Sequence, residues 1–134
     1  MTGRVLALDH GEARCGAAIS DPTGTLATPL DPVERPDTKK GMQRLRALIA
    51  ATGAERVVVG LPLSLSGADP GQTRAARAFA ARLADGAGVH VELYDERFTT
   101  RIAERTGGSM SEDSRAAAIL LEDWMRARQG GQSD

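Results

Sequence analysis

The sequence of 134 residues is long enough to bury one hydrophobic core, and its 41% hydrophobic and 26% charged residues are typical of a folded domain and exclude a disordered chain. A net charge of −1 argues against strong non-specific binding of nucleic acid, and 3% aromatic residues argue against a stacking platform for bases. The single cysteine, Cys15, excludes an intramolecular disulfide, and the apolar run before Asp9 is too short for a signal peptide or a membrane span. We therefore expect a cytoplasmic protein with no membrane partner.

The hydrophobic pattern predicts three closely linked strands, followed by helices that alternate with two further strands. These elements are expected over residues 4–8, 14–20, 25–33, 37–51, 56–60, 69–86, 89–94 and 112–127. Asp37 is expected to cap the first helix and Gly53 to end it. The order βββαβαβα predicts an α/β fold with a five-stranded mixed sheet and helices on both faces. We expect one domain over residues 1–129 and a flexible tail over residues 130–134.

Asp9 follows directly on the first apolar strand and shares a face with Val5 and Ala7, because side chains alternate along a strand. A carboxylate on a buried face is costly unless it is paired, hydrogen-bonded or bound to metal. The carboxyl ends of strands are also where open α/β sheets place ligands. The alternative is a structural aspartate that closes the turn after the strand.

Two adjacent carboxylates, Asp95 and Glu96, follow the fifth predicted strand. In a regular strand Asp95 continues the face of Leu93, whereas Glu96 continues the face of Tyr94. At most one of them should therefore join Asp9 directly, unless the end of the strand bends. The alternative is that they cap a helix that follows.

Asp113 lies in the first turn of the last predicted helix. It belongs to an apolar stripe expected to face inward, which continues through Ala116, Ala117, Leu120 and Trp124. A charged residue at the head of such a stripe is unusual, and the alternative is a favourable interaction with the helix N-terminus. Carboxylates from the first strand, the fifth strand and this helix would together suit Mg²⁺ or Mn²⁺ in a two-metal site for phosphodiester hydrolysis.

Five motifs, spread over nearly the whole chain, resemble in order those of the YqgF/RuvX family of RNase H-fold nucleases. They are residues 9–16 (DHGEARCG), 20–22 with 27–30 (SDP and ATPL), 57–63 (VVVGLPL), 95–100 (DERFTT) and 113–124 (DSRAAAILLEDW). The resemblance implies an RNase H-like fold and a divalent-metal-dependent nuclease. The implied roles are 5′-end processing of pre-16S rRNA, resolution of Holliday junctions, or cleavage of branched or single-stranded DNA.

Carried over by position, the resemblance implies that Asp9, Glu96 and Asp113 are the catalytic carboxylates. Asp95 stands beside them as a further metal ligand or as the alternative to Glu96. Arg14 and Arg97 would contact the nucleic acid. The cofactor would be Mg²⁺ or Mn²⁺, and whether the active form is a homodimer is left open.

The chain departs from the family pattern in two places. Ala13 stands where relatives often carry Lys, so Arg14 replaces that residue in charge but not in geometry. The segment between Thr100 and Asp113 is shorter than the basic loop usual in relatives, which bears on the grip and choice of substrate. His10 is expected on the face opposite Asp9, either as a ligand or phosphate contact or as a packed side chain.

Two other functions fit the same fold. An actin-like ATP-binding domain shares the Asp-x-Gly start, but it needs two such domains, and 134 residues supply one. A non-catalytic module that binds RNA or protein fits the short loop and the near-neutral charge. A non-catalytic module would, however, have no need for the three carboxylates Asp9, Glu96 and Asp113 together.

Overall fold

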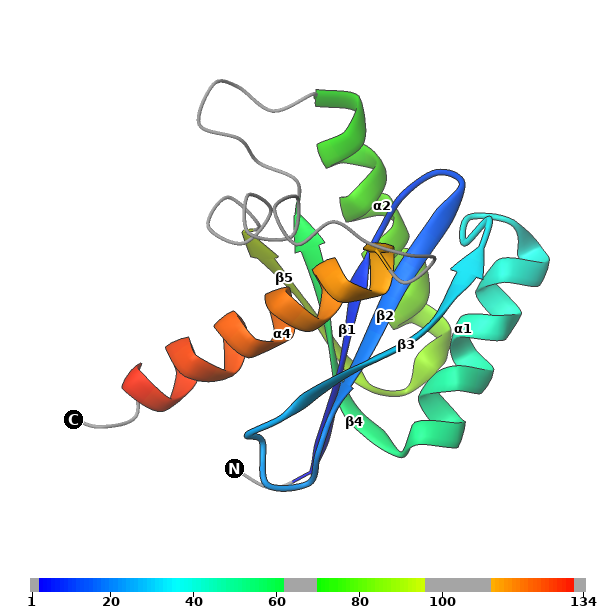
Figure 1. Cartoon of the computed structure of the whole chain (residues 1–134). Helices are drawn as coiled ribbons and strands as arrows, with labels where there is room; N and C mark the ends of the chain where they lie inside the picture. The colour runs from blue at the N-terminus through cyan, green and yellow to red at the C-terminus, as the bar shows by residue number, and fades with distance from the viewer. Residues whose placement is uncertain (1–2, 62–69, 96–111, 132–134) are drawn as a thin grey trace.

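The computed structural model describes residues 3–61, 70–95 and 112–131, which form a five-stranded sheet covered by helices on both faces (Figure 1). The strands follow one another across the sheet in the order β3-β2-β1-β4-β5. Their bounds are β1 Arg4–Asp9, β2 Arg14–Ser20, β3 Ala27–Glu34, β4 Ala54–Leu61 and β5 His90–Asp95. Apart from at most two residues at either end, these are the strands that the sequence pattern predicts.

The sheet is mixed, as predicted. β1 pairs antiparallel with β2, and β2 pairs antiparallel with β3, which is the predicted meander. β4 lies between β1 and β5 and is parallel to both. Helices α1 (Lys39–Thr52) and α2 (Pro70–Ala87) therefore serve as crossover connections, which bring the carboxyl ends of β1, β4 and β5 to the same edge.

The N-cap of helix α1 lies one residue later than the sequence predicts. Thr38, not Asp37, is the N-cap, and its hydroxyl accepts a hydrogen bond from the Gly41 backbone N–H at 3.0 Å. Gly53 ends the helix with a φ of 72°, a left-handed conformation that glycine adopts without strain. Threonine caps a helix almost as well as aspartate, and this leaves the Asp37 carboxylate available for a contact elsewhere.

Two apolar clusters fill the two layers. The first lies between the sheet and the α1–α2 layer and contains Leu6, Leu8, Val59 and Phe79. The second lies under helix α4 (Glu112–Gly131) and contains Val5, Ala7, Val58 and Trp124. Successive residues of β1 and β4 therefore alternate between the two clusters, which assigns every side chain on these strands to one face.

Helix α4 crosses the second face of the sheet and runs to Gly131, beyond the predicted end at residue 127 (Figure 1). The flexible tail stays a prediction, because residues 132–134 lie outside the described ranges. No helix in the described ranges is both long enough and apolar enough to cross a membrane.

Candidate metal centre

Asp9 lies at the carboxyl end of β1, half-buried, where its Cα pairs with that of Gly16 on β2. Val5 and Ala7 belong to the cluster beneath α4. By strand alternation Asp9 faces the α4 layer as well, as the sequence pattern predicts.

Gly16 allows α4 to touch the sheet beside Asp9. A Cβ atom at Gly16 would lie 2.0 Å from the Asp113 carbonyl oxygen, so only a glycine permits this approach. The pairing of β2 with β3 shifts register between Cys15 and Ala17, at the same place. Asp9 and the backbone of Asp113, in the first turn of α4, therefore lie on either side of Gly16.

Ser114 fixes this approach. Its hydroxyl is fully buried and accepts a hydrogen bond from the Ala17 backbone N–H at 3.2 Å. The buried stripe of α4 accordingly starts at Ser114 and continues through Ala117, Ala118 and Leu121. Asp113, predicted to lead that stripe, lies instead at its margin with 42% of its side chain exposed. A half-exposed carboxylate is accessible to a metal ion and a substrate.

Arg14, predicted to contact nucleic acid, forms an ion pair with Asp113. Its Nε donates to Asp113 Oδ2 at 2.9 Å. This hydrogen bond and the charges of Asp113 and Glu34 raise the pKa of the Arg14 guanidinium above its ordinary value. Arg14 thus places a permanent positive charge, about half exposed, beside the carboxylates.

On the fifth strand, Tyr94 packs into the cluster beneath α4, whereas Leu93 packs against the α1–α2 cluster. Asp9 therefore shares its face with Tyr94. Asp95 is the last residue of β5, and its Cα pairs with that of Leu61 on β4. The Asp95 side chain, Glu96 and Arg97 fall outside what the structure describes, so the role of each stays a prediction.

His10 lies on the face opposite Asp9, as predicted, and of its two predicted roles the structure shows the packed side chain. Its Nε2 lies 2.8 Å from Asp37 Oδ2, and its ring lies against Phe79 with the centroids 4.6 Å apart. The side chain is 6% exposed. The His10–Asp37 contact was not foreseen, because it joins positions 27 residues apart that no local pattern connects.

Cys15 is also unsuited to metal binding. Burial, and then the charges of Asp9, Asp37 and Asp113, raise the pKa of its thiol well above the ordinary value. A protonated thiol is a poor ligand. No group of three histidine, cysteine, aspartate or glutamate side chains in the described residues is placed to hold a metal ion, so the predicted centre needs its fifth-strand carboxylate. The donors placed on this face are oxygens, which favours a hard cation.

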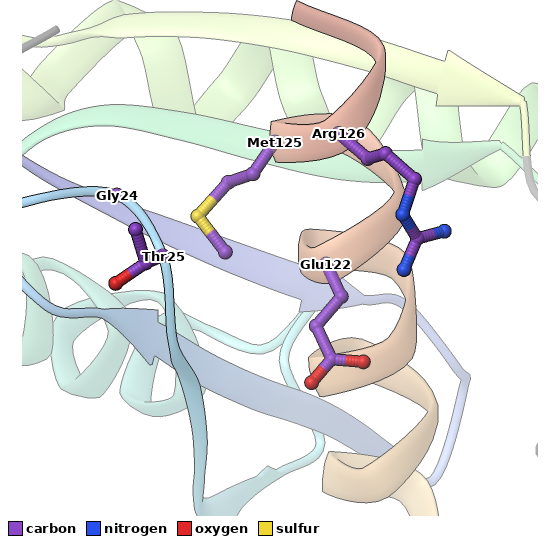
Figure 2. Close-up of a pocket in the computed structure, with 5 residues that line it drawn as sticks. All are labelled: Gly24, Thr25, Glu122, Met125 and Arg126. Atoms are coloured by element: carbon purple, nitrogen blue, oxygen red, sulfur yellow. The ribbon is translucent and has the colours of Figure 1, made fainter. Parts of the chain in front are cut away.

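A separate pocket of about 310 Å³ lies at the opposite edge of the sheet. It is formed by the turn after β2 and by α4, and its lining residues are Gly24, Thr25, Glu122, Met125 and Arg126. In Figure 2, Met125 extends from α4 toward that turn. The turn follows the end of β2 that pairs with the start of β1, so the pocket is not part of the carboxylate site.

Comparison with known families gives the decisive observation. Residues 3–127 match the family model described as RuvX, Holliday junction resolvase. The chain belongs to the RuvX family. The predicted family, and with it the nuclease class, is confirmed, and the match covers every element that supplies a predicted carboxylate.

Curated relatives agree with the RuvX assignment. A protein from Anaplasma marginale is 36% identical over 95% of this chain and 87% of its own length. One from Thermobifida fusca is 43% identical over 91% of this chain and 86% of its own length. Both are named as candidate pre-16S rRNA nucleases.

Solved structures confirm the RNase H-like fold of this RuvX protein. Thermus thermophilus RuvC superimposes with a TM-score of 0.61 at 19% identity, covering 95% of this chain and 96% of that protein. The same RuvC in complex with a Holliday junction superimposes with a TM-score of 0.60. At this identity the likeness establishes the fold alone.

Proposed function

We propose that this RuvX protein is a divalent-metal-dependent nuclease that hydrolyses a phosphodiester bond near the 5′ end of pre-16S rRNA. The proposal is supported by the placement of Asp9 and the Asp113 backbone on either side of Gly16. The names of the curated relatives support the choice of substrate. A location in the cytoplasm would follow from that role.

The donor set fits the proposed metal. Asp9 and Asp113 supply carboxylate oxygens, while His10 is directed to the other face and Cys15 keeps its proton. Oxygen ligands with room for water and phosphate suit Mg²⁺ or Mn²⁺, and one or two such ions would be held by Asp9, Asp113 and a fifth-strand carboxylate. When bound, the metal supplies charge neutralisation at the phosphate and an activated water.

Glu96 is the proposed fifth-strand ligand. Asp9 lies on the face of Tyr94, and a strand that stayed regular for two more residues would return to that face at Glu96. Asp95 would then point toward the α1–α2 layer. The asymmetry of the two faces therefore favours Glu96 over Asp95.

The arginines have separate roles in this proposal. Arg14 holds Asp113 through Nε, and the rest of its half-exposed guanidinium can donate to a phosphate oxygen. Arg97, next to Glu96 in the sequence, is proposed as a second phosphate contact. Positive charge beside the carboxylates offsets the repulsion between an acidic site and an anionic substrate.

A cleavage assay tests the proposed function. The wild-type chain and Asp9→Asn are incubated with a precursor RNA carrying the 5′ end of 16S rRNA, a four-way DNA junction and a single-stranded DNA, in Mg²⁺, Mn²⁺ or EDTA. We expect metal-dependent cleavage of the RNA precursor, abolished by EDTA and by Asp9→Asn. Exclusive cleavage of the junction would overturn the substrate assignment. RNA binding without any cleavage would favour a non-catalytic module.

A further inference from the structure

The charge of the molecule is divided unevenly between its layers. Helix α1 contains four basic residues and no acidic residue, and α2 contains three arginines and one aspartate, Asp85. The α1–α2 layer thus has a net charge of +6. Because the whole chain has a net charge of −1, the remaining residues together carry −7. The near-neutral total hides a strongly basic face.

The basic side chains of this layer are exposed and not neutralised. Lys39, Lys40, Arg44, Arg74 and Arg77 are all exposed, and none of them forms an ion pair within the described ranges. By contrast, arginines on the α4 side do pair with carboxylates, as the Arg56–Glu92 distance of 2.7 Å and the Arg14–Asp113 contact show.

A genome rich in arginine codons does not explain this distribution. Codon bias would raise the arginine content of every helix, and α4 does have three arginines, as α2 has, but α4 also has four acidic residues. What distinguishes α1 and α2 is the near absence of acids. Depletion of one sign of charge on one face is the pattern expected of a surface that meets a polyanion.

Two further basic residues join the helices into one surface. Arg82 Nη1 donates to the Asp37 carbonyl oxygen at 2.9 Å, just before α1 begins. Arg46 Nη2 donates to the Arg82 carbonyl oxygen at 3.3 Å. These contacts hold α1 and α2 side by side.

The basic layer reaches the edge of the sheet where Asp9 lies. His10, the residue after Asp9, contacts both Asp37 and Phe79, so the first turn of α1 and the middle of α2 lie at that level. The N-terminal turns of α2 extend past the carboxyl ends of β4 and β5 (Figure 1). At a rise of about 1.5 Å per residue, Arg77 lies about 3 Å and Arg74 about 8 Å further out.

We propose that the α1–α2 layer is a docking surface for the sugar–phosphate backbone of the RNA whose scissile bond lies at Asp9. Lys39 and Lys40 on α1, and Arg74 and Arg77 on α2, contact phosphates that flank the cleaved bond. The RNA strand passes over the edge of the sheet formed by the carboxyl ends of β1, β4 and β5, from the face that bears Asp9 onto the α1–α2 layer. This inference rests on the proposed function and names the surface that positions its substrate.

Charge-reversal variants test the docking surface. Lys39→Glu with Lys40→Glu, and Arg74→Glu with Arg77→Glu, each change the net charge by −4 on the proposed surface. The control, Arg4→Glu with Arg126→Glu, makes the same change at exposed positions elsewhere. Lys39 and Lys40 lie in the first turn of α1, where acidic residues are favourable, and Arg74 and Arg77 are exposed on α2. Both test variants are therefore expected to stay folded, which thermal unfolding checks.

Binding is measured with a fluorescent RNA hairpin in EDTA over a range of salt concentrations, so that no cleavage occurs. Each lost phosphate contact should lower the slope of log K against log salt by about 0.7 to 0.9. We expect each test variant to lose about 1.5 units of slope and to bind at least about tenfold more weakly than the control at low salt. In cleavage assays KM should rise while kcat is retained.

Test variants that bind with the slope and affinity of the control would overturn the docking surface. Cleavage by the wild type together with that result would leave the proposed function standing. The opposite result is also distinguishable. If the wild type cleaves nothing but the test variants bind RNA more weakly than the control, the docking surface is supported and the nuclease function is contradicted.

Discussion

At Gly16 the absence of a side chain decides where the last helix lies. The Asp113 carbonyl oxygen occupies the space that a Cβ atom would need, and Ser114 bonds to the next residue of the strand, Ala17. Gly16 is also the Cα partner of Asp9. One glycine therefore sets how closely the backbone of Asp113 approaches the strand beside Asp9, although the two residues come from opposite ends of the chain.

Replacing Gly16 with alanine should disturb the site and the fold together. The added methyl group meets backbone atoms of α4, which cannot rotate away, so we expect a loss of about 1–3 kcal/mol in the free energy of unfolding. Urea denaturation measures that loss. Mn²⁺ binding should weaken as well, because Asp113 moves away from Asp9.

Gly24→Ala is the matched control for this substitution. Its φ of 75° strains an alanine, but a Cβ atom there meets nothing within 4 Å. It should reduce stability and leave Mn²⁺ affinity unchanged. Equal Mn²⁺ affinity in Gly16→Ala and the wild type would show that the contact with α4 does not position the site.

The choice between Glu96 and Asp95 is a second prediction at the scale of single residues. Since Asp9 and Tyr94 share the α4 face, Glu96→Gln should reduce metal-dependent cleavage at least about 100-fold, whereas Asp95→Asn should retain most of it. Single-turnover cleavage rates of the two variants, at saturating Mn²⁺, give the comparison. The reverse order would mean that the strand bends before Glu96 and that Asp95 is the ligand.

Among the elements, α4 is held against the sheet by polar contacts as well as by its apolar stripe. Trp124 Nε1 donates to Glu92 Oε2 at 2.8 Å, and Tyr94 Oη donates to Asp123 Oδ2 at 2.6 Å. Arg56 Nη1 donates to the other Glu92 oxygen at 2.7 Å. These contacts fasten the middle of the helix to β5, while Ser114 fastens its first turn to β2.

This attachment predicts a pH dependence of stability. Partial burial raises the pKa of the Glu92 carboxyl, but the hydrogen bonds from Trp124 and Arg56 outweigh it, so the pKa lies below its ordinary value. A depressed pKa means that the unfolded chain binds the proton more readily. The contribution of Glu92 is therefore present above the ordinary carboxyl pKa and is lost as the pH falls through the folded-state pKa.

Glu92→Gln isolates that contribution. The wild type should unfold at a higher temperature than Glu92→Gln at neutral pH, and the difference should shrink as the pH falls below the ordinary carboxyl pKa. Thermal unfolding of both proteins over the acidic range measures it. A difference that is constant with pH would show that the charge of Glu92 does not stabilise the fold.

At the scale of the whole molecule, local pattern was enough to predict the sheet. Apolar runs marked the strands, and Asp9 and Asp95 end two of them at the edge where open α/β sheets place ligands. The helix boundary at Thr38 was misplaced by one residue because aspartate and threonine are near-equal caps.

Contacts between segments that are distant in the sequence could not be predicted from the local sequence pattern. Ser114 could have been found, since it precedes Ala117 and Leu121 at helical spacing, but a serine is not normally read as part of an apolar stripe. The His10–Asp37 contact and the Arg14–Asp113 ion pair join distant segments. The basic face was invisible in the net charge, because acidic residues in the rest of the chain cancel it.

The claim on which the rest depends is that Asp9 is the central ligand of a metal centre made only of oxygen ligands. Isothermal titration calorimetry of Mn²⁺ binding to the wild-type chain and to Asp9→Asn tests it directly. We predict binding to the wild type with a dissociation constant at least about tenfold lower than that of the variant, with both proteins equally folded. Equal affinity of the two proteins for Mn²⁺ would contradict the account.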